Sequence, residues 1–122
     1  MATPRVIPIT RIVPTEDGGS CFVDAEVALT NATSIGFLSD MENAKGIIFR
    51  ETDGSYDLDF HNAPRKQYIL ILNGAVDITT TDGVTRRFKD GDIFLVEDTT
   101  GRGHKSKNVN GGTRRSVFIA LE

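Results

Sequence analysis

The chain alternates short apolar runs with turn-forming residues. Runs such as 45–51, 67–72 and 93–96 are rich in Val, Ile, Phe and Leu. Dipeptides that favour turns, among them Asn73-Gly74, close several of these runs. Short runs bounded in this way are typical of β-strands, and no long stretch has the 3.6-residue period of an amphipathic helix. The pattern therefore predicts an all-β fold.

The apolar runs also predict how the strands are arranged. Residues 1–20 contain three prolines and are expected to form a lead-in, and residues 31–43 are expected to be irregular because they are too polar for a buried strand. Short strands at close spacing suit a jelly-roll barrel, in which closure or double layering hides the sheet edges. The expected strands are 21–27, 45–51, 56–61, 67–72, 75–80, 85–88, 93–96 and 115–121.

Composition limits the class of protein. A chain of 122 residues, 39% hydrophobic and 25% charged, suits one globular domain, expected over 1–122 with the barrel core at 45–121. No run approaches the roughly 20 apolar residues of a membrane span, and the proline-containing N-terminus does not resemble a secretion signal. We therefore expect a cytoplasmic protein with no membrane partner. The single cysteine, Cys21, excludes an intrachain disulfide and is interpreted as a core residue.

Charge is spread unevenly along the chain. The formal net charge is −3, but residues 65–115 hold ten basic and six acidic side chains, so this segment is positive by four. A solvated barrel surface and an anion-binding face both account for this excess. No aromatic residues alternate with the cations as a platform for stacking bases would require, so nucleic acid is not an expected partner.

The two histidines of the chain fall in an ordered pattern. His61 stands six positions before Gln67, and six residues separate Gln67 from Gly74. Further along, Gly91 opens a strand, and His104 is followed after three residues by Asn108. This pattern resembles the two motifs of the cupin superfamily, G-x5-H-x-H-x3–4-E-x6-G and G-x5-P-x-G-x2-H-x3-N.

The resemblance implies a cupin-type jelly-roll barrel, also called a double-stranded β-helix, with a pocket inside it. It also implies metal ligands at His61, Gln67 and His104, for iron, manganese, nickel or zinc. Ala63 stands where the motif has its second His, and Gln67 replaces the Glu. An alanine cannot coordinate, and an amide is a weaker ligand than a carboxylate, so a divalent metal and a metal-free pocket both stay open. Carboxylates that could complete a metal shell are Glu51, Asp59 and Glu97.

The first functional hypothesis is a small-molecule enzyme of the lyase, isomerase or dioxygenase type. It would act on a metabolite that bears a carbonyl or carboxylate group, with His61, His104 and Glu97 as catalytic residues. Glu97 and Asp98 end an apolar strand, which suits either a loop cap or a general base at the mouth of the barrel. The residues expected to bind the substrate are Arg65, Gln67, Glu51 and Tyr56.

The second hypothesis is a barrel that binds a small ligand without transforming it. The missing second His and the missing acidic ligand of the cupin pattern favour this alternative. The resemblance further implies a homodimer, because cupins often associate through an N-terminal strand or a barrel face.

Overall fold

A computed structural model describes residues 5–121, and in this part of the chain every regular element is a β-strand. No helix in this range is long and apolar enough to cross a membrane. The predicted all-β fold is confirmed. The strands are β1 (Val6–Pro14), β2 (Ser20–Ala28), β3 (Asn31–Thr33), β4 (Gly36–Leu38), β5 (Ala44–Thr52), β6 (Asp57–His61), β7 (Gln67–Asn73), β8 (Ala75–Thr79), β9 (Thr85–Lys89), β10 (Ile93–Val96), β11 (His104–Asn108) and β12 (Arg114–Leu121).

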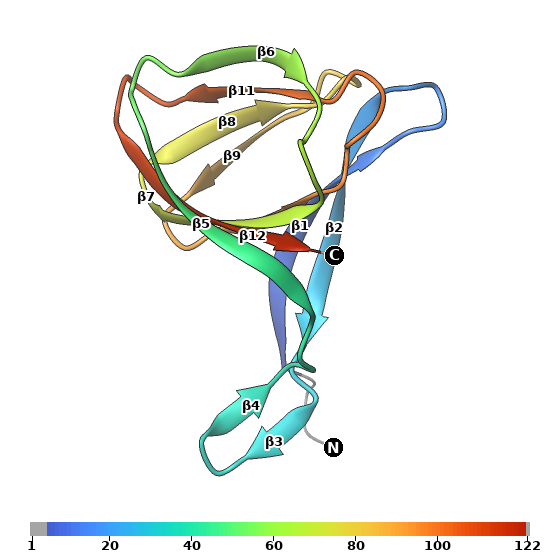
Figure 1. The fold of residues 1–122 in the computed structure, drawn as a ribbon, viewed down its shortest axis with the longest axis vertical. Helices are drawn as coiled ribbons and strands as arrows, with labels where there is room; N and C mark the ends of the chain where they lie inside the picture. The colour runs from blue at the N-terminus through green and yellow to red at the C-terminus, as the bar shows by residue number, and fades with distance from the viewer. Residues whose placement is uncertain (1–4, 122) are drawn as a thin grey trace.

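Two sheets face each other and enclose the core (Figure 1). The larger sheet has the strand order β2-β1-β10-β7-β12-β5, and the smaller has the order β6-β11-β8-β9. All neighbouring strands are antiparallel except β1 and β10, which pair in parallel. This arrangement is the predicted jelly-roll barrel. The core contains Ile12, Ala63, Ile69, Ile71, Val76, Ile78, Phe88, Phe94 and Val96.

Strand alternation decides which side chains point into the barrel. In β7, Gln67, Ile69 and Ile71 are buried while the residues between them are less buried. The register places Phe118 of β12 and Phe94 of β10 on either side of Ile69, so all three belong to the inner face. A continuous apolar wall therefore lines one side of the interior, and Gln67 is the polar residue at its end.

Three segments differ from the sequence-based expectation. The proline-bearing lead-in contains β1, whose prolines Pro8 and Pro14 lie outside the Thr10–Ile12 segment that pairs with β10. The region expected to be irregular forms the β3–β4 hairpin, which projects away from the barrel (Figure 1). A polar strand, β11, was not predicted. Residues 1–4 of the lead-in lie outside the described residues.

Candidate functional site

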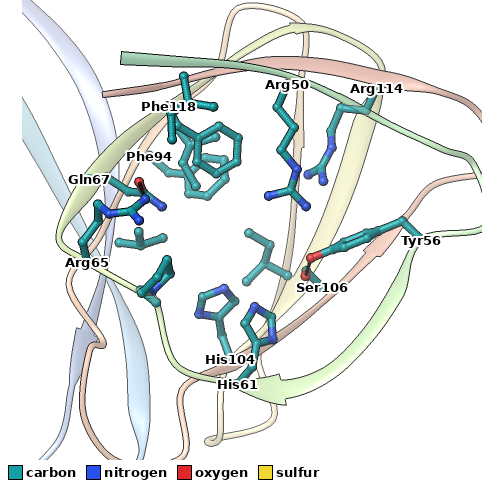
Figure 2. A pocket seen from close by; sticks show the side chains of 16 residues that line it. Arg50, Tyr56, His61, Arg65, Gln67, Phe94, His104, Ser106, Arg114 and Phe118 are labelled. Carbon is teal, nitrogen blue, oxygen red and sulfur yellow. Dashed lines mark hydrogen bonds between the residues drawn. The ribbon is translucent and has the colours of Figure 1, made fainter. Parts of the chain in front are cut away.

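A cavity of about 160 Å³ lies between the two sheets (Figure 2). Sites for drug-sized ligands usually measure about 300–1,000 Å³, so this cavity suits a smaller metabolite. Five of the residues expected at the site line this cavity together. They are Tyr56, His61, Arg65, Gln67 and His104.

The two histidines meet because β6 and β11 are paired. The antiparallel register sets His61 directly opposite His104, and the ring centroids lie 4.7 Å apart. The preceding residue, Gly103, has φ +72°, and a Cβ there would lie 1.8 Å from the carbonyl oxygen of His61. Only glycine accepts both the left-handed backbone and this close approach without strain. Gly103 therefore allows the two strands to bring the imidazole rings together.

Each histidine is held through its Nδ1 atom. His104 Nδ1 donates to Asp98 Oδ2 at 2.5 Å, and the Asp98 side chain is fully buried. His61 Nδ1 lies 2.8 Å from the backbone oxygen of Asp59, which can only accept, so this nitrogen also carries hydrogen. The Nε2 atom of each neutral ring is then the one that can accept a proton. The site thus has two imidazole bases side by side, one of them backed by a carboxylate.

Two arginines that the sequence analysis missed line the opposite end of the cavity (Figure 2). Arg114 on β12 is only 4% exposed, and its guanidinium lies 5.3 Å from the ring centre of Tyr56. Arg50 on β5 lies 5.6 Å from the same ring and 5.1 Å from that of Phe118. The hydroxyl of Tyr56 lies 2.7 Å from Ser106 Oγ, which fixes the ring between the two ends. Burial lowers the pKa of Arg114 from its usual value.

Strand alternation could have pointed to Arg114. Because Phe118 points inward, residues two and four positions earlier on β12 share its face. Those residues are Ser116 and Arg114, and both are buried. The strand predicted from the sequence started at Arg115, one residue after Arg114, where β12 begins.

The three acids expected near the site, Glu51, Asp59 and Glu97, lie outside the cavity lining. Asp59 is exposed, and its side chain accepts a hydrogen bond from the backbone N–H of Phe60. Glu97 forms a bidentate pair with Arg11, at 2.6 and 3.1 Å, and lies 3.4 Å from Lys66 Nζ. The hydrogen bond from Arg11 lowers the pKa of Glu97 below its usual value, against the opposing effect of burial. Glu51 follows Arg50 on β5, so alternation turns it to the outer face, where it pairs with Arg115 at 3.2 Å. The placement of Glu97 and Glu51 in the pocket is therefore corrected.

The remaining predicted residues do lie together, but they do not form a donor set suited to a divalent ion. Within residues 5–121, no three His, Cys, Asp or Glu side chains come together as a metal would require. Gln67 Oε1 lies 3.4 Å from Arg65 Nη1, so a guanidinium lies beside the one amide donor. Arg50 and Arg114 add further positive charge to the same cavity. Two imidazoles and an amide beside three cations do not fit a resident metal.

Sequence comparisons give no family. No family model matches this chain, and no curated protein matches it. Three solved structures are similar in fold at low identity. A Neisseria meningitidis protein is 18% identical, with a TM-score of 0.49, over 66% of this chain and 78% of its own.

The other two structures cover nearly the whole chain. A protein of Salmonella typhimurium LT2, described as ethanolamine utilization protein Q, is 12% identical, with a TM-score of 0.45. The match covers 96% of this chain and 97% of that protein. The cupin domain of Schizosaccharomyces pombe Cnp3 is 13% identical, with a TM-score of 0.46, over 100% of this chain and 86% of its own. The two facing sheets and their strand order, described above, give this chain a jelly-roll fold.

Proposed function

We propose that this chain is a small-molecule enzyme of the lyase or isomerase type, which moves a proton at a carbon atom next to a carbonyl or carboxylate group. One observation carries the proposal. His61 and His104 lie side by side in one cavity, and each is bonded through Nδ1 so that Nε2 is available. Paired imidazoles with separate supports suit general acid and base catalysis.

The environments of the two rings suggest different roles. His104 is 6% exposed and is bonded to the buried Asp98, whose negative charge stabilises the imidazolium that forms when Nε2 accepts a proton. We assign His104 as the base. His61 is half-buried and bonds only to a backbone oxygen, so it can exchange protons with solvent and return one to the substrate. Gln67 and Arg65 are placed to hold a substrate oxygen.

No observation of the structure tests the metal implied by the cupin resemblance directly, and we propose chemistry that does not require one. The arginines of the cavity favour an anionic ligand over a divalent cation. Elemental analysis of protein purified without a His-tag tests the point directly. We expect less than one tenth of an equivalent of iron, manganese, nickel or zinc, and a stoichiometric ion that resists chelation would contradict the metal-free chemistry.

Deuterium exchange tests proton transfer directly, because it needs no assay for a particular product. The protein is incubated in D₂O with a panel of small hydroxy acids and keto acids, and loss of the C–H signal is followed by proton NMR. We expect catalysed exchange with at least one acid, and loss of this exchange in His104→Gln and in His61→Gln. Lys107→Ala is the control, because Lys107 lies on β11 like His104 but points outward. Exchange that persists in both histidine variants would contradict the assignment.

The alternative is a barrel that binds a small ligand without transforming it. The replacement of the second motif His by Ala63, which is buried in the core, favours this function. The same panel separates the two, because an acid that raises the melting temperature but shows no exchange and no turnover supports binding alone.

A further inference from the structure

We infer that Arg114 and Arg50 form a site for the oxyanion group of the ligand, a carboxylate or a phosphate. The strongest evidence is the state of Arg114. It is 4% exposed, lines the cavity, and takes part in no ion pair within residues 5–121. Its buried Nε atom has no hydrogen-bond partner in the part of the chain that the structure describes. A buried charge without a partner is costly, so a structure that keeps one normally has an anion that binds there.

Arg50 completes the site from the neighbouring strand. The register of β5 with β12 places Arg50 opposite Ser116 and Thr52 opposite Arg114, so the two arginines lie diagonally across the pair on the inner face. Both guanidinium groups lie within 6 Å of the Tyr56 ring, and the charge of Arg50 disfavours that of Arg114. No acidic side chain of the described residues lines this cavity. A bound oxyanion would offset this positive charge and accept hydrogen bonds from both guanidinium groups.

The position of this site limits the ligand. The arginines stand at one end of the cavity and the histidines at the other (Figure 2). The cavity of about 160 Å³ leaves room only for a short molecule between them. On the proposed function, the ligand is therefore a small organic acid whose oxyanion binds Arg114 and Arg50 while its proton-bearing carbon lies at His104.

Calorimetry and thermal unfolding test the oxyanion site with defined probes. We use succinate, its uncharged dimethyl ester and inorganic phosphate with the wild-type chain and with Arg114→Gln, Arg50→Gln and Arg115→Gln. Arg115 is the matched control, because it is next to Arg114 but exposed and paired with Glu51 on the outer face. We expect the wild-type chain to bind succinate or phosphate with millimolar or tighter affinity and not to bind the ester. The affinity should fall at least tenfold in Arg114→Gln and in Arg50→Gln but not in Arg115→Gln.

Each result of this experiment answers a different question about the ligand or the site. Preference for succinate over phosphate identifies a carboxylate ligand, and the reverse identifies a phosphorylated one. Equal weakening in Arg115→Gln, or no binding of either anion to the wild-type chain, would overturn the inference.

Two further results separate this inference from the proposed function. Anion binding that survives in His104→Gln, without deuterium exchange in any variant, supports the oxyanion site and contradicts the enzyme. If the methyl esters of the panel acids are tested as well, exchange on the esters alone supports the enzyme and contradicts the oxyanion site.

In the absence of ligand, Arg114→Met should unfold at the same temperature as the wild-type chain or higher, because it removes a buried charge that no acidic side chain of the described residues pairs with. A clear loss of stability would show that a partner within the protein already compensates Arg114.

A second inference concerns the free edge of the larger sheet and is independent of the pocket. Strand β5 ends this sheet, and its residues are exposed except the last. Ile47, Ile48 and Phe49 are 56%, 50% and 73% exposed. A long apolar edge strand with free backbone groups readily pairs with another chain. We propose that β5 pairs antiparallel with β5 of a second copy.

Charge and apolar pattern select one register for this pairing. A two-fold axis at Ile48 sets Lys45 opposite Glu51 of the second copy and Ile47 opposite its Phe49. Moving the centre by two residues in either direction sets Lys45 or Glu51 opposite an apolar residue instead. Ile48 and Arg50 also line the cavity, so the second copy would extend the wall beside the oxyanion site.

Sedimentation equilibrium with charge exchange tests the dimer. The variants are made in the Arg115→Gln chain, so that Arg115 does not bind or repel residue 51. We expect a dimer at micromolar concentration, weakening by at least tenfold in Lys45→Glu and in Glu51→Lys, and recovery of most of the affinity when both changes are combined. A monomer at 100 µM, or a double variant as weak as the single ones, would overturn this inference.

Discussion

The two ends of the cavity are built in opposite ways. At the histidine end, β6 and β11 of the smaller sheet present rings whose Nδ1 atoms have partners, Asp98 for His104 and a backbone oxygen for His61. At the arginine end, β5 and β12 of the larger sheet present Arg50 and Arg114, neither of which forms an ion pair within residues 5–121. The Nδ1 atom of each histidine has a partner within the described residues, although the buried Asp98 Oδ1 has none, whereas no acidic side chain of these residues lies at the arginine end.

This difference suggests that the two ends of the cavity have different roles. A ring that is fixed through one nitrogen keeps its orientation while the other nitrogen gains and loses a proton. A guanidinium with unused donors gains most from a ligand that supplies the missing charge. On the proposed function, proton transfer therefore belongs to the smaller sheet and ligand binding to the larger one. Three variants test this assignment, in order of decreasing expected effect.

The largest effect is expected when the histidine end is forced apart. In Gly103→Ala the new Cβ would collide with the backbone of His61, in addition to the roughly 1–2 kcal/mol that a left-handed backbone costs a residue with a side chain. Gly83→Ala is the matched control, since Gly83 has φ +85° and nothing within 4 Å. We expect Gly103→Ala to lower the free energy of unfolding by at least about 3 kcal/mol and Gly83→Ala by about 1 kcal/mol. Equal losses in urea unfolding would show that the close approach is unimportant.

A smaller structural effect with a large chemical one is expected for Asp98→Asn. The amide presents hydrogen to Nδ1 of His104, so the ring should move its own hydrogen to Nε2 and cease to act as a base. Long-range nitrogen–proton NMR should show this change of tautomer, and deuterium exchange should fall by about 10²–10⁴-fold. His61 is the internal control, because its partner is a backbone oxygen. An unchanged His104 signal would contradict the role given to Asp98.

The apolar strands could be predicted from the sequence because each one carries its own signal. Strand β11 carries none, since its buried positions are His104, Ser106 and Asn108. Their contacts come from distant residues: Ser106 Oγ bonds to the hydroxyl of Tyr56, and Asn108 Nδ2 donates to the backbone oxygen of Asp53, while Asn108 Oδ1 has no partner among the described residues. A polar strand of this kind becomes visible only when the partners across the barrel are known.

The candidate site was predictable in part for the same reason. The motif spacing marked His61, Gln67 and His104, and the structure places all three around one cavity. The spacing could not mark Arg114, because its importance lies in the absence of a nearby acid, which is a property of the folded chain. Nor could it separate the adjacent acids Glu97 and Asp98. Glu97 is partly buried and pairs with Arg11 outside the cavity, whereas Asp98 is fully buried against His104.

The smallest effect is expected at Glu97, and it tests whether this acid belongs to either end of the cavity. The pKa of Glu97 is lowered by Arg11, so the pair stabilises the fold above the ordinary carboxyl pKa, and this contribution is lost as the pH falls through the lowered value. Arg11 and Lys66 are 38% and 50% exposed while Glu97 is 13% exposed, and glutamine can keep a hydrogen bond to Arg11, so Glu97→Gln should lower the free energy of unfolding at pH 7 by about 1 kcal/mol. The difference from the wild-type chain should shrink as the pH falls below the ordinary carboxyl pKa, while succinate binding and deuterium exchange at pH 7 stay unchanged. A tenfold loss of exchange would instead return Glu97 to the catalytic role that the sequence pattern gave it.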